Sequence, residues 1–307
     1  MIDQLVSVIV ATVVAGTPLV YAALGELVVE RSGVLNLGVE GMMLTGAIVA
    51  FAAVAATGNV WLGVGAAMFA AMLLSLLFAL LTISLQANQV AIGLALSIFG
   101  TGLSAFLGQS YVGTALVIEP SAISSVLGKL PLIGPALEQF HPLVLLSWLL
   151  FAAVWVFFRK TRAGLIVHAI GESPSSAFAI GYPVVPIRYA ATLFGGAMAG
   201  VAGAYVSVIY TSLWTEGLTA GRGWIAVALV VFATWRPERV MLGAYLFGGV
   251  SMIQLFAQAQ GIAVPAELMA ALPYLATILV LVLISRDRSL IRLNVPASLG
   301  KPFRAGL

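Results

Sequence analysis

Long apolar stretches alternate with short polar ones along almost the whole chain. Each long stretch approaches the ~20 residues that a helix needs to cross the hydrocarbon core of a bilayer. A shorter apolar stretch, residues 223–235, either crosses as well or re-enters on the same side. The pattern predicts an all-α, polytopic membrane helix bundle of about 8–10 transmembrane segments with broken or re-entrant helices. The long stretches are residues 5–24, 36–57, 61–85, 88–110, 142–158, 189–211, 241–261 and 268–285.

Composition supports a membrane location. Charged residues make up 8% of the chain, against about 25% in soluble domains, and 62% of residues are hydrophobic. The mean hydropathy is +1.11. The chain lacks cysteine, which excludes disulfides and thiolate chemistry. The two histidines, His141 and His168, are expected in separate loops without a second ligand at metal spacing.

The basic residues predict the orientation of the bundle. With the short stretch counted as a crossing, the chain has nine segments, the N-terminus outside and the C-terminus inside. An eight-segment arrangement is equally open. The sequence starts without a basic region, so residues 5–24 are expected to be a retained span. The nine-segment arrangement leaves only Lys129 and Arg222 outside, in agreement with the positive-inside rule. The inside residues are then Arg31, Arg159, Lys160, Arg162, Arg188, Arg236, Arg239, Arg286, Arg288, Arg292, Lys301 and Arg304.

A polar island at residues 159–188 interrupts the apolar pattern and is expected on the cytoplasmic side. Within it, Ser173 suits a helix N-cap, Pro174 the first helical position and Gly181 the left-handed residue after the end. These signals predict a helix at residues 174–180, roughly 10 Å long. A helix this short is marginal in water and needs support. Either it docks on a partner, or it is an interfacial linker packed on its own bundle.

The junction between the first two long stretches is unusually polar. Acids in or near apolar spans are costly unless they are paired or hydrated. Glu26 and Glu40 are therefore candidates to line a water-filled path or to hold the register of the bundle. Glu30 and Arg31 are expected to form an interfacial ion pair.

Glycines interrupt two segments in different halves of the chain. Gly38, Gly41 and Gly46 dilute the start of the second segment, and Gly221-Arg222-Gly223-Trp224 opens the short one. In transporters, broken helices at corresponding positions expose backbone groups to substrate. Close helix packing explains these glycines equally well. The candidate substrate-pathway residues are Asn36, Glu40, Asn88, Gln89 and Trp224, whose amides, carboxylate and indole suit a hydroxylated or aromatic ligand.

Other features are interpreted as structural. Small residues four apart at Gly195, Ala199 and Gly203, and at Gly196 and Gly200, predict close helix approach within or between subunits. Residues 111–141 form the longest outer loop, expected to be an ordered cap. The basic tail, residues 286–307, is expected to be solvated or bound to headgroups. The domain organisation is therefore one transmembrane domain, residues 1–285, followed by this cytoplasmic tail.

Motifs for several enzyme classes are missing. The Gly-Lys pairs at Gly128 and Gly300 are followed by Leu130 and Pro302, so the sequence has no P-loop. It also contains neither G-x-S-x-G nor H-E-x-x-H. The chain is therefore expected not to be an enzyme, with no catalytic or metal site.

Three stretches together resemble permease subunits of ABC importers of the branched-chain amino acid and ribose class, in the simple-sugar and nucleoside branch. The first runs from Glu30 to Met43 and reads ERSGVLNLGVEGMM. The second is Gly171-Glu172-Ser173-Pro174 through Ala177 and Gly181, which is similar to the family's cytoplasmic coupling loop. The third, residues 221–229, resembles the late glycine-rich segment of the nucleoside branch. Relatives often have Asn where this chain has Ser173, and serine caps a helix comparably.

The resemblance implies partners and a mechanism. Helix 174–180 would sit in a groove of a separate ATP-binding cassette subunit, which uses ATP and Mg²⁺. This chain would bind no cofactor of its own. A second permease subunit, expected to be non-identical, and an extracytoplasmic substrate-binding protein would complete the importer. The expected location is the bacterial plasma (inner) membrane.

The expected function is ATP-driven uptake of nucleosides, with simple sugars such as ribose as the alternative substrate. A rival hypothesis is a stand-alone secondary transporter driven by an ion gradient. That mechanism needs a titratable or ion-binding acid in mid-span, and Glu40 is the one plausible residue. A third hypothesis is a membrane scaffold without transport activity.

Overall fold

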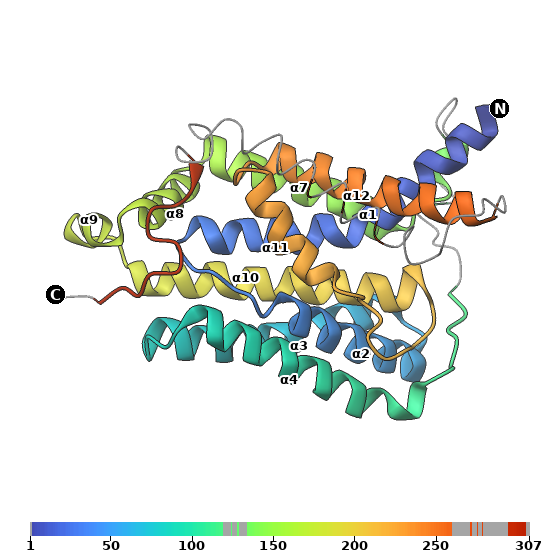
Figure 1. Cartoon of the computed structure of the whole chain (residues 1–307), viewed down its shortest axis with the longest axis horizontal. Coiled ribbons are helices and arrows are strands. Elements are labelled where there is room, and N and C mark those ends of the chain that lie inside the picture. Colours follow the sequence, from blue (N-terminus) through green and yellow to red (C-terminus); the bar gives the residue numbers. More distant parts are fainter. Residues whose placement is uncertain are drawn as a thin grey trace.

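The computed structural model describes residues 2–118, 134–259 and 294–304, together with the isolated residues 124, 128, 271, 275 and 278. These residues form a bundle of long helices, with the short helices α8 (Arg162–Glu172) and α9 (Pro174–Ala179) at one end (Figure 1). Within the described ranges the only β-structure is a single bridge between Ala115 and Leu213. The predicted all-α membrane bundle is therefore confirmed.

The elements follow the predicted apolar stretches closely. The π-helical turns η1 and η3 extend α3 and α10, and the 3₁₀ turn η2 extends α4. The long helices are α1 (Ile2–Arg31), α2 (Val39–Thr57), α3 (Val60–Ala79), α4 (Gln89–Gly108), α7 (Pro142–Lys160), α10 (Val184–Ala204) and α12 (Pro237–Ala259). The shorter elements are η1 (Leu80–Ser84), η2 (Gln109–Tyr111), α6 (Gly134–Leu137), α8 (Arg162–Glu172), α9 (Pro174–Ala179), η3 (Tyr205–Tyr210) and α11 (Arg222–Phe232).

Six helices in the described part of the chain are long and apolar enough to cross a membrane. They correspond to the first six long stretches of the sequence. The eighth stretch, residues 268–285, lies outside the continuously described residues, so the number of crossings stays a prediction. The spans are Val6–Arg31, Val39–Thr57, Val60–Ser84, Gln89–Tyr111, Pro142–Lys160 and Val184–Tyr210.

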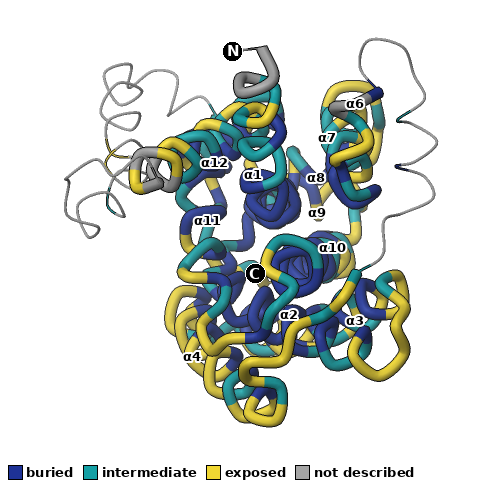
Figure 2. Tube along the Cα trace, turned by 90° about the vertical axis from the view of Figure 1, so that its right-hand side faces the viewer, coloured by how far each residue is buried: buried dark blue, intermediate teal, exposed yellow. Residues whose placement is uncertain are grey.

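Helices α1, α2 and α10 form the centre of the bundle, and Figure 2 shows long buried stretches in α1 and α10. The small residues of α10 make this possible. Gly195 lies against Val29 of α1, Gly200 against Ala67 of α3, and Gly203 against Met43 of α2. A side chain at these positions would collide with the neighbouring helix. The predicted close approach is confirmed, and the partner helices belong to the same chain.

Two interruptions place non-helical backbone partway along the bundle (Figure 1). The first is the segment 32–38, which follows α1 and leads into α2. The second is the loop 211–221, which precedes α11. Helix α11 has 11 residues, about 16 Å of helix, roughly half the thickness of a hydrocarbon core. It therefore needs the preceding loop to complete a crossing.

Residues 294–304 lie at the end of the bundle that carries α8 and α9, opposite the N-terminus (Figure 1). Phe303 packs with Ile170 of α8 and Ala177 of α9 in a small apolar cluster. Ser298 is buried. Pro296 and Ser298 therefore pack on the protein itself, whereas the basic residues Lys301 and Arg304 are exposed, so the expectation of a solvated or headgroup-bound tail stays a prediction.

Candidate functional site

The two interrupted segments meet at Glu40, in the first turn of α2. The Glu40 Oε1 atom accepts hydrogen bonds from the Thr219 hydroxyl at 2.5 Å and from the Gly221 N–H at 3.0 Å. The Oε2 atom accepts from the Gly223 N–H at 2.6 Å. The first N–H groups of a helix have no partner inside it, and here the Glu40 carboxylate supplies one. Glu40 thus caps α11 and joins it to α2.

Glycine is required where α11 begins. A Cβ atom on Gly223 would lie 2.5 Å from the Glu40 Cα atom, too close for any side chain. The first residue before α11, Gly221, has φ +80°, a left-handed conformation that favours glycine. The two glycine-interrupted segments of the sequence therefore contact each other. Both oxygens of Glu40 are engaged with the second segment, which supports a role in holding the register of the bundle.

Side chains replace the missing helical hydrogen bonds in segment 32–38. The Leu35 N–H donates to Gln89 Oε1 at 2.8 Å, and the Asn36 N–H donates to Glu26 Oε1 at 3.1 Å. The Gly38 N–H donates to Asn36 Oδ1 at 2.9 Å. Glu26, Asn36 and Gln89 are all buried. Their side chains accept hydrogen bonds from the non-helical backbone of segment 32–38. These bonds fix the path of the segment between α1 and α2.

Helix α4 holds the same region from the other side. The Ser97 hydroxyl donates to the Leu37 carbonyl at 2.8 Å. A Cβ atom on Gly93 would lie 2.8 Å from the Leu37 N atom, and Gly100 faces the Gly41 backbone as closely. The series Gly93, Ser97 and Gly100 is a small-residue face that the sequence analysis missed, although its spacing of four and three residues is a signal for it.

The five predicted pathway residues fall into two groups. Asn36, Glu40 and Gln89 are buried and satisfied by backbone groups, as described above. Asn88 is exposed, and its side chain caps α4 by accepting from the Ala91 N–H. Trp224, in the first turn of α11, is 38% exposed, and its role in a substrate pathway stays a prediction.

The polar island forms two helices. The Thr161 side chain caps α8, and Ser173 caps α9 by accepting from the Ser176 N–H at 3.3 Å. Gly181, which follows the C-cap residue Ile180, has φ +95°. The predicted short helix is thus confirmed within a residue. Helix α8 was missed, so His168 lies on a helix and not in a loop, whereas His141 lies directly before α7 and caps it.

Helix α9 both packs on the bundle and presents an outer face. Ala177 is 3% exposed and contacts the cluster that contains Ile170 and Val184. Phe178 is 45% exposed and Ile180 is 73% exposed. The residue that the sequence marks within the coupling motif, Ala177, therefore anchors the helix, while its neighbours are available to a partner.

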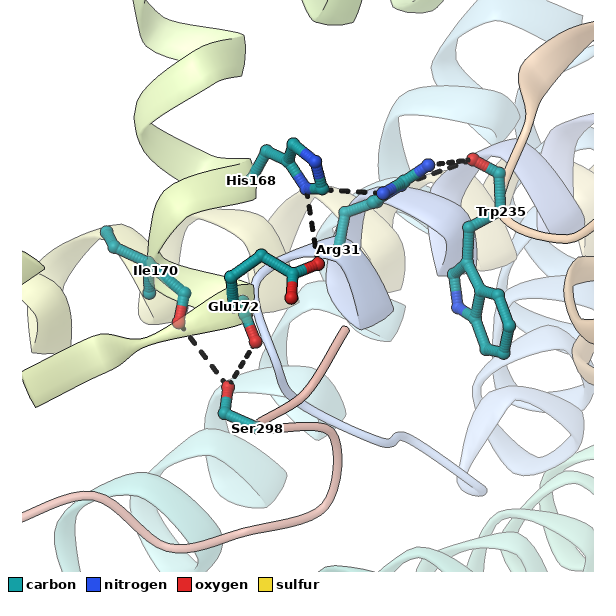
Figure 3. A network of polar contacts seen from close by, with 7 residues as sticks. Arg31, His168, Ile170, Glu172, Trp235 and Ser298 are labelled. Atoms are coloured by element: carbon teal, nitrogen blue, oxygen red, sulfur yellow. Dashed lines mark hydrogen bonds and ion pairs between the residues drawn. The ribbon is translucent and has the colours of Figure 1, made fainter. Parts of the chain in front are cut away.

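Arg31 links three elements at the same end of the bundle (Figure 3). Its Nε and Nη2 atoms donate to the Trp235 carbonyl at 3.2 and 2.8 Å, and its Nη1 atom donates to His168 Nδ1 at 3.2 Å. Glu30 accepts from the Trp235 indole at 2.5 Å. The expected Glu30–Arg31 ion pair is wrong, because adjacent helical residues point in different directions. Both side chains instead bind Trp235, in the turn between α11 and α12.

The environment of His168 favours its neutral form. Burial lowers the pKa of His168, and the positive charge of Arg31 lowers it further. Glu172, whose carboxylate lies 3.9 Å from His168 Nδ1, acts in the opposite direction but is the weaker influence. A neutral ring with a free Nδ1 is the form that accepts a hydrogen bond from Arg31. Among the described residues, no group of three His, Cys, Asp or Glu side chains is placed to hold a metal ion.

Comparison with known proteins identifies the family. Residues 8–283 match the family described as the permease component of branched-chain amino acid transport systems. No solved structure gives a significant match. The chain is 42% identical to a "Putative glucose ABC transporter permease protein" of Haloferax volcanii, over 94% of both chains. It is 32% identical to a guanosine ABC transporter permease of Bacillus subtilis, over 99% of both chains. It is 29% identical to a nucleoside ABC transporter permease of Lactococcus lactis, over 92% of this chain and 93% of the relative. This chain therefore belongs to the permease family of branched-chain amino acid transport systems, with sugar and nucleoside ABC permeases among its relatives.

Proposed function

We propose that this chain is the transmembrane permease subunit of an ATP-driven importer for nucleosides. The observation that carries the proposal is α9, a capped helix at one end of the bundle with an anchored side and an exposed apolar side. Phe178 and Ile180 form the exposed side. A short amphipathic helix of this kind suits a hydrophobic groove on a partner. The chain has no P-loop, so ATP and Mg²⁺ would be used by the partner subunit.

The contacts define a route from α9 to the broken segments. Helix α9 follows α8 directly, and His168 of α8 is hydrogen-bonded to Arg31 at the end of α1. Arg31 also holds the Trp235 carbonyl after α11, and Glu40 joins the start of α11 to α2. Closure of the ATP-binding partner would push α9 and rock these elements together. Alternating access to a site between the broken helices would follow.

The proposal includes three partners and an orientation. An ATP-binding cassette subunit would dock on α9, a second and non-identical permease would complete the pathway, and an extracytoplasmic binding protein would deliver substrate. The clustering of Arg31, Arg159 and Arg188 at the α9 end favours a cytoplasmic location for that end of a bacterial plasma membrane protein. The N-terminus would then lie outside.

A nucleoside substrate is supported by two relatives and by Trp224, whose partly exposed indole suits stacking on a base. The Haloferax volcanii relative favours a simple sugar as the second candidate. Both ligand types are rich in hydroxyl groups. An indole can stack on a base or on the face of a sugar ring, so Trp224 suits both candidates and the uptake measurement decides between them.

Uptake measurements test the function. The chain and its partners are reconstituted in liposomes, and the uptake of radiolabelled guanosine and of radiolabelled glucose is compared with and without internal ATP. The proposal predicts ATP-dependent guanosine uptake that Trp224→Ala weakens. ATP-dependent glucose uptake without guanosine uptake would establish the second candidate. Uptake that is independent of ATP but depends on an imposed ion gradient would refute the proposal of an ATP-driven importer.

A further inference from the structure

Residues 295–304, here called the C-terminal strap, cap the helix that precedes α9. The Ser298 N–H donates to the Gly171 carbonyl at 2.9 Å, and the Ser298 hydroxyl donates to the same carbonyl at 2.7 Å. Figure 3 shows the Ser298 hydroxyl facing the carbonyl of Ile170, the residue before Gly171 in α8. Carbonyls in the last turn of a helix lack partners inside the helix. The strap therefore supplies hydrogen bonds to a carbonyl in the last turn of α8.

The same serine touches the first broken segment. Gly33 has φ +87°, and a Cβ atom on it would collide with the Ser298 hydroxyl and with Arg188 Nη2. The Gly300 N–H donates to the Gly33 carbonyl at 3.2 Å. Glycine is needed at position 33 both for its backbone conformation and for this close approach. The strap is thus in direct contact with segment 32–38, near its departure from α1.

Arg188, near the start of α10, fastens the strap to that segment. Only 2% of this residue is exposed. Its Nε atom donates to the Ser32 carbonyl at 3.0 Å, and its Nη2 atom donates to the Ser298 hydroxyl at 3.1 Å. A guanidinium presents its donors in a rigid planar fork, which fixes the relative positions of the groups it binds. Arg188 therefore holds segment 32–38 and the strap in one geometry.

The far part of the strap lies on α9. The Phe303 ring packs edge-on against Phe178, with 5.9 Å between ring centroids. The Arg188 guanidinium lies 6.0 Å from the centre of the same Phe303 ring. The Phe303 carbonyl accepts from the Gln86 side chain at 3.1 Å, which holds the strap against the turn after η1. One short stretch of chain thus joins α9 to Gly33.

We propose that the C-terminal strap is a transmission element of the importer and that Ser298 and Arg188 are its positioning residues. The inference rests on the proposed function. Movement of α9 reaches segment 32–38 through Phe303, Ser298 and Gly33, a path independent of the His168–Arg31 contact. The segment leads directly into α2 and Glu40. If the strap transmits this movement, it determines how much substrate is transported per ATP hydrolysed. It does not determine whether the ATP-binding subunit binds to the permease.

The test compares Ser298→Ala with Ser251→Ala in the complete importer. Ser251 is the matched control, because its hydroxyl donates to the Phe247 carbonyl of its own helix at 3.0 Å. Three quantities are measured: the ATP-binding subunit that co-purifies, the ATP hydrolysis rate, and uptake of radiolabelled guanosine or glucose. Ser298→Ala is expected to keep the first two within about twofold of wild type and to lower uptake per ATP by about tenfold. Ser251→Ala is expected to match wild type.

A second variant keeps the inference falsifiable if Ser298→Ala fails to accumulate in the membrane. Phe303→Ala removes the contact with α9 while leaving the Ser298 hydrogen bonds, and the same fall in uptake per ATP is expected. Unchanged uptake per ATP in whichever of the two variants accumulate would overturn the proposal, as would loss of the ATP-binding subunit from them. Absence of ATP-dependent uptake in wild type would instead refute the proposed function.

Discussion

Glu40→Gln tests the contact that joins the two broken segments. In the native chain, Oε1 accepts from Thr219 and Gly221, and Oε2 accepts from the Gly223 N–H. A glutamine side chain has one acceptor oxygen, and its amide group is a donor. If the oxygen faces Gly223, the amide faces the Gly221 N–H, and the opposite orientation puts it against the Gly223 N–H. The first orientation leaves the partly buried Gly221 N–H without a partner, and the second leaves the buried Gly223 N–H without one.

The magnitude follows from two costs. A buried donor left unsatisfied costs about 1–3 kcal/mol. Loss of a carboxylate at the N-terminus of α11 removes about 0.3–1 kcal/mol of favourable interaction with the helix dipole. Together these give a loss of roughly 1–4 kcal/mol in unfolding free energy. At about 2–4 °C per kcal/mol, the unfolding midpoint should fall by roughly 3–16 °C.

The assay is thermal unfolding of the purified protein in detergent, with Glu216→Gln as the control. Glu216 belongs to the same loop, 211–221, and is exposed, so the same substitution there should leave the midpoint unchanged. A Glu40→Gln midpoint equal to that of Glu216→Gln would refute the capping role. Retained stability together with loss of ion-gradient-dependent uptake would revive the secondary-transporter hypothesis.

Three further predictions follow from other contacts. Gly223→Ala should lower both stability and uptake, since its Cβ atom would lie 2.5 Å from the Glu40 Cα atom; normal uptake would contradict the close approach. Ser173→Ala should destabilise α9 by about 1 kcal/mol, seen as faster amide hydrogen exchange in residues 174–179, and unchanged exchange would contradict the cap. The pKa of His168 is lowered in the folded state, so its contribution to stability is present above pH 6.5 and is lost as the pH falls below that value. His168→Gln should flatten the dependence of the unfolding midpoint between about pH 7 and pH 5, and an unchanged slope would contradict the assignment.

Local signals predicted the long helices and the cap of α9. Ser173, Pro174 and Gly181 each act on backbone groups within a few residues, so their roles follow from the sequence alone. The apolar stretches likewise predicted the spans, because bilayer thickness fixes their length. The small residues of α10 predicted close packing, because they leave room for another helix whatever its identity.

Long-range pairings were not predictable in this way. Glu40 was singled out as a costly acid, but its partners Thr219 and Gly223 are about 180 residues away, and no local rule connects them. The strap carries no apolar periodicity, and it binds through backbone groups, the Ser298 hydroxyl and the Phe303 ring. Its basic residues suggested solvent instead. The roles of Trp235 and Arg188 likewise depend on the folded arrangement of α1, α8 and α10.

The central claim is that α9 docks an ATP-binding subunit, and co-purification from the native membrane tests it most directly. The chain is purified in mild detergent as wild type, as Ile180→Asp and as Val117→Asp, and stoichiometric partners are identified by mass spectrometry. Val117 is 94% exposed and lies beyond α4, away from α9, so it controls for an added surface charge. The account predicts an ATP-binding subunit with wild type and Val117→Asp, and its loss with Ile180→Asp. Recovery of this chain without such a subunit from wild type, at normal expression, would contradict it.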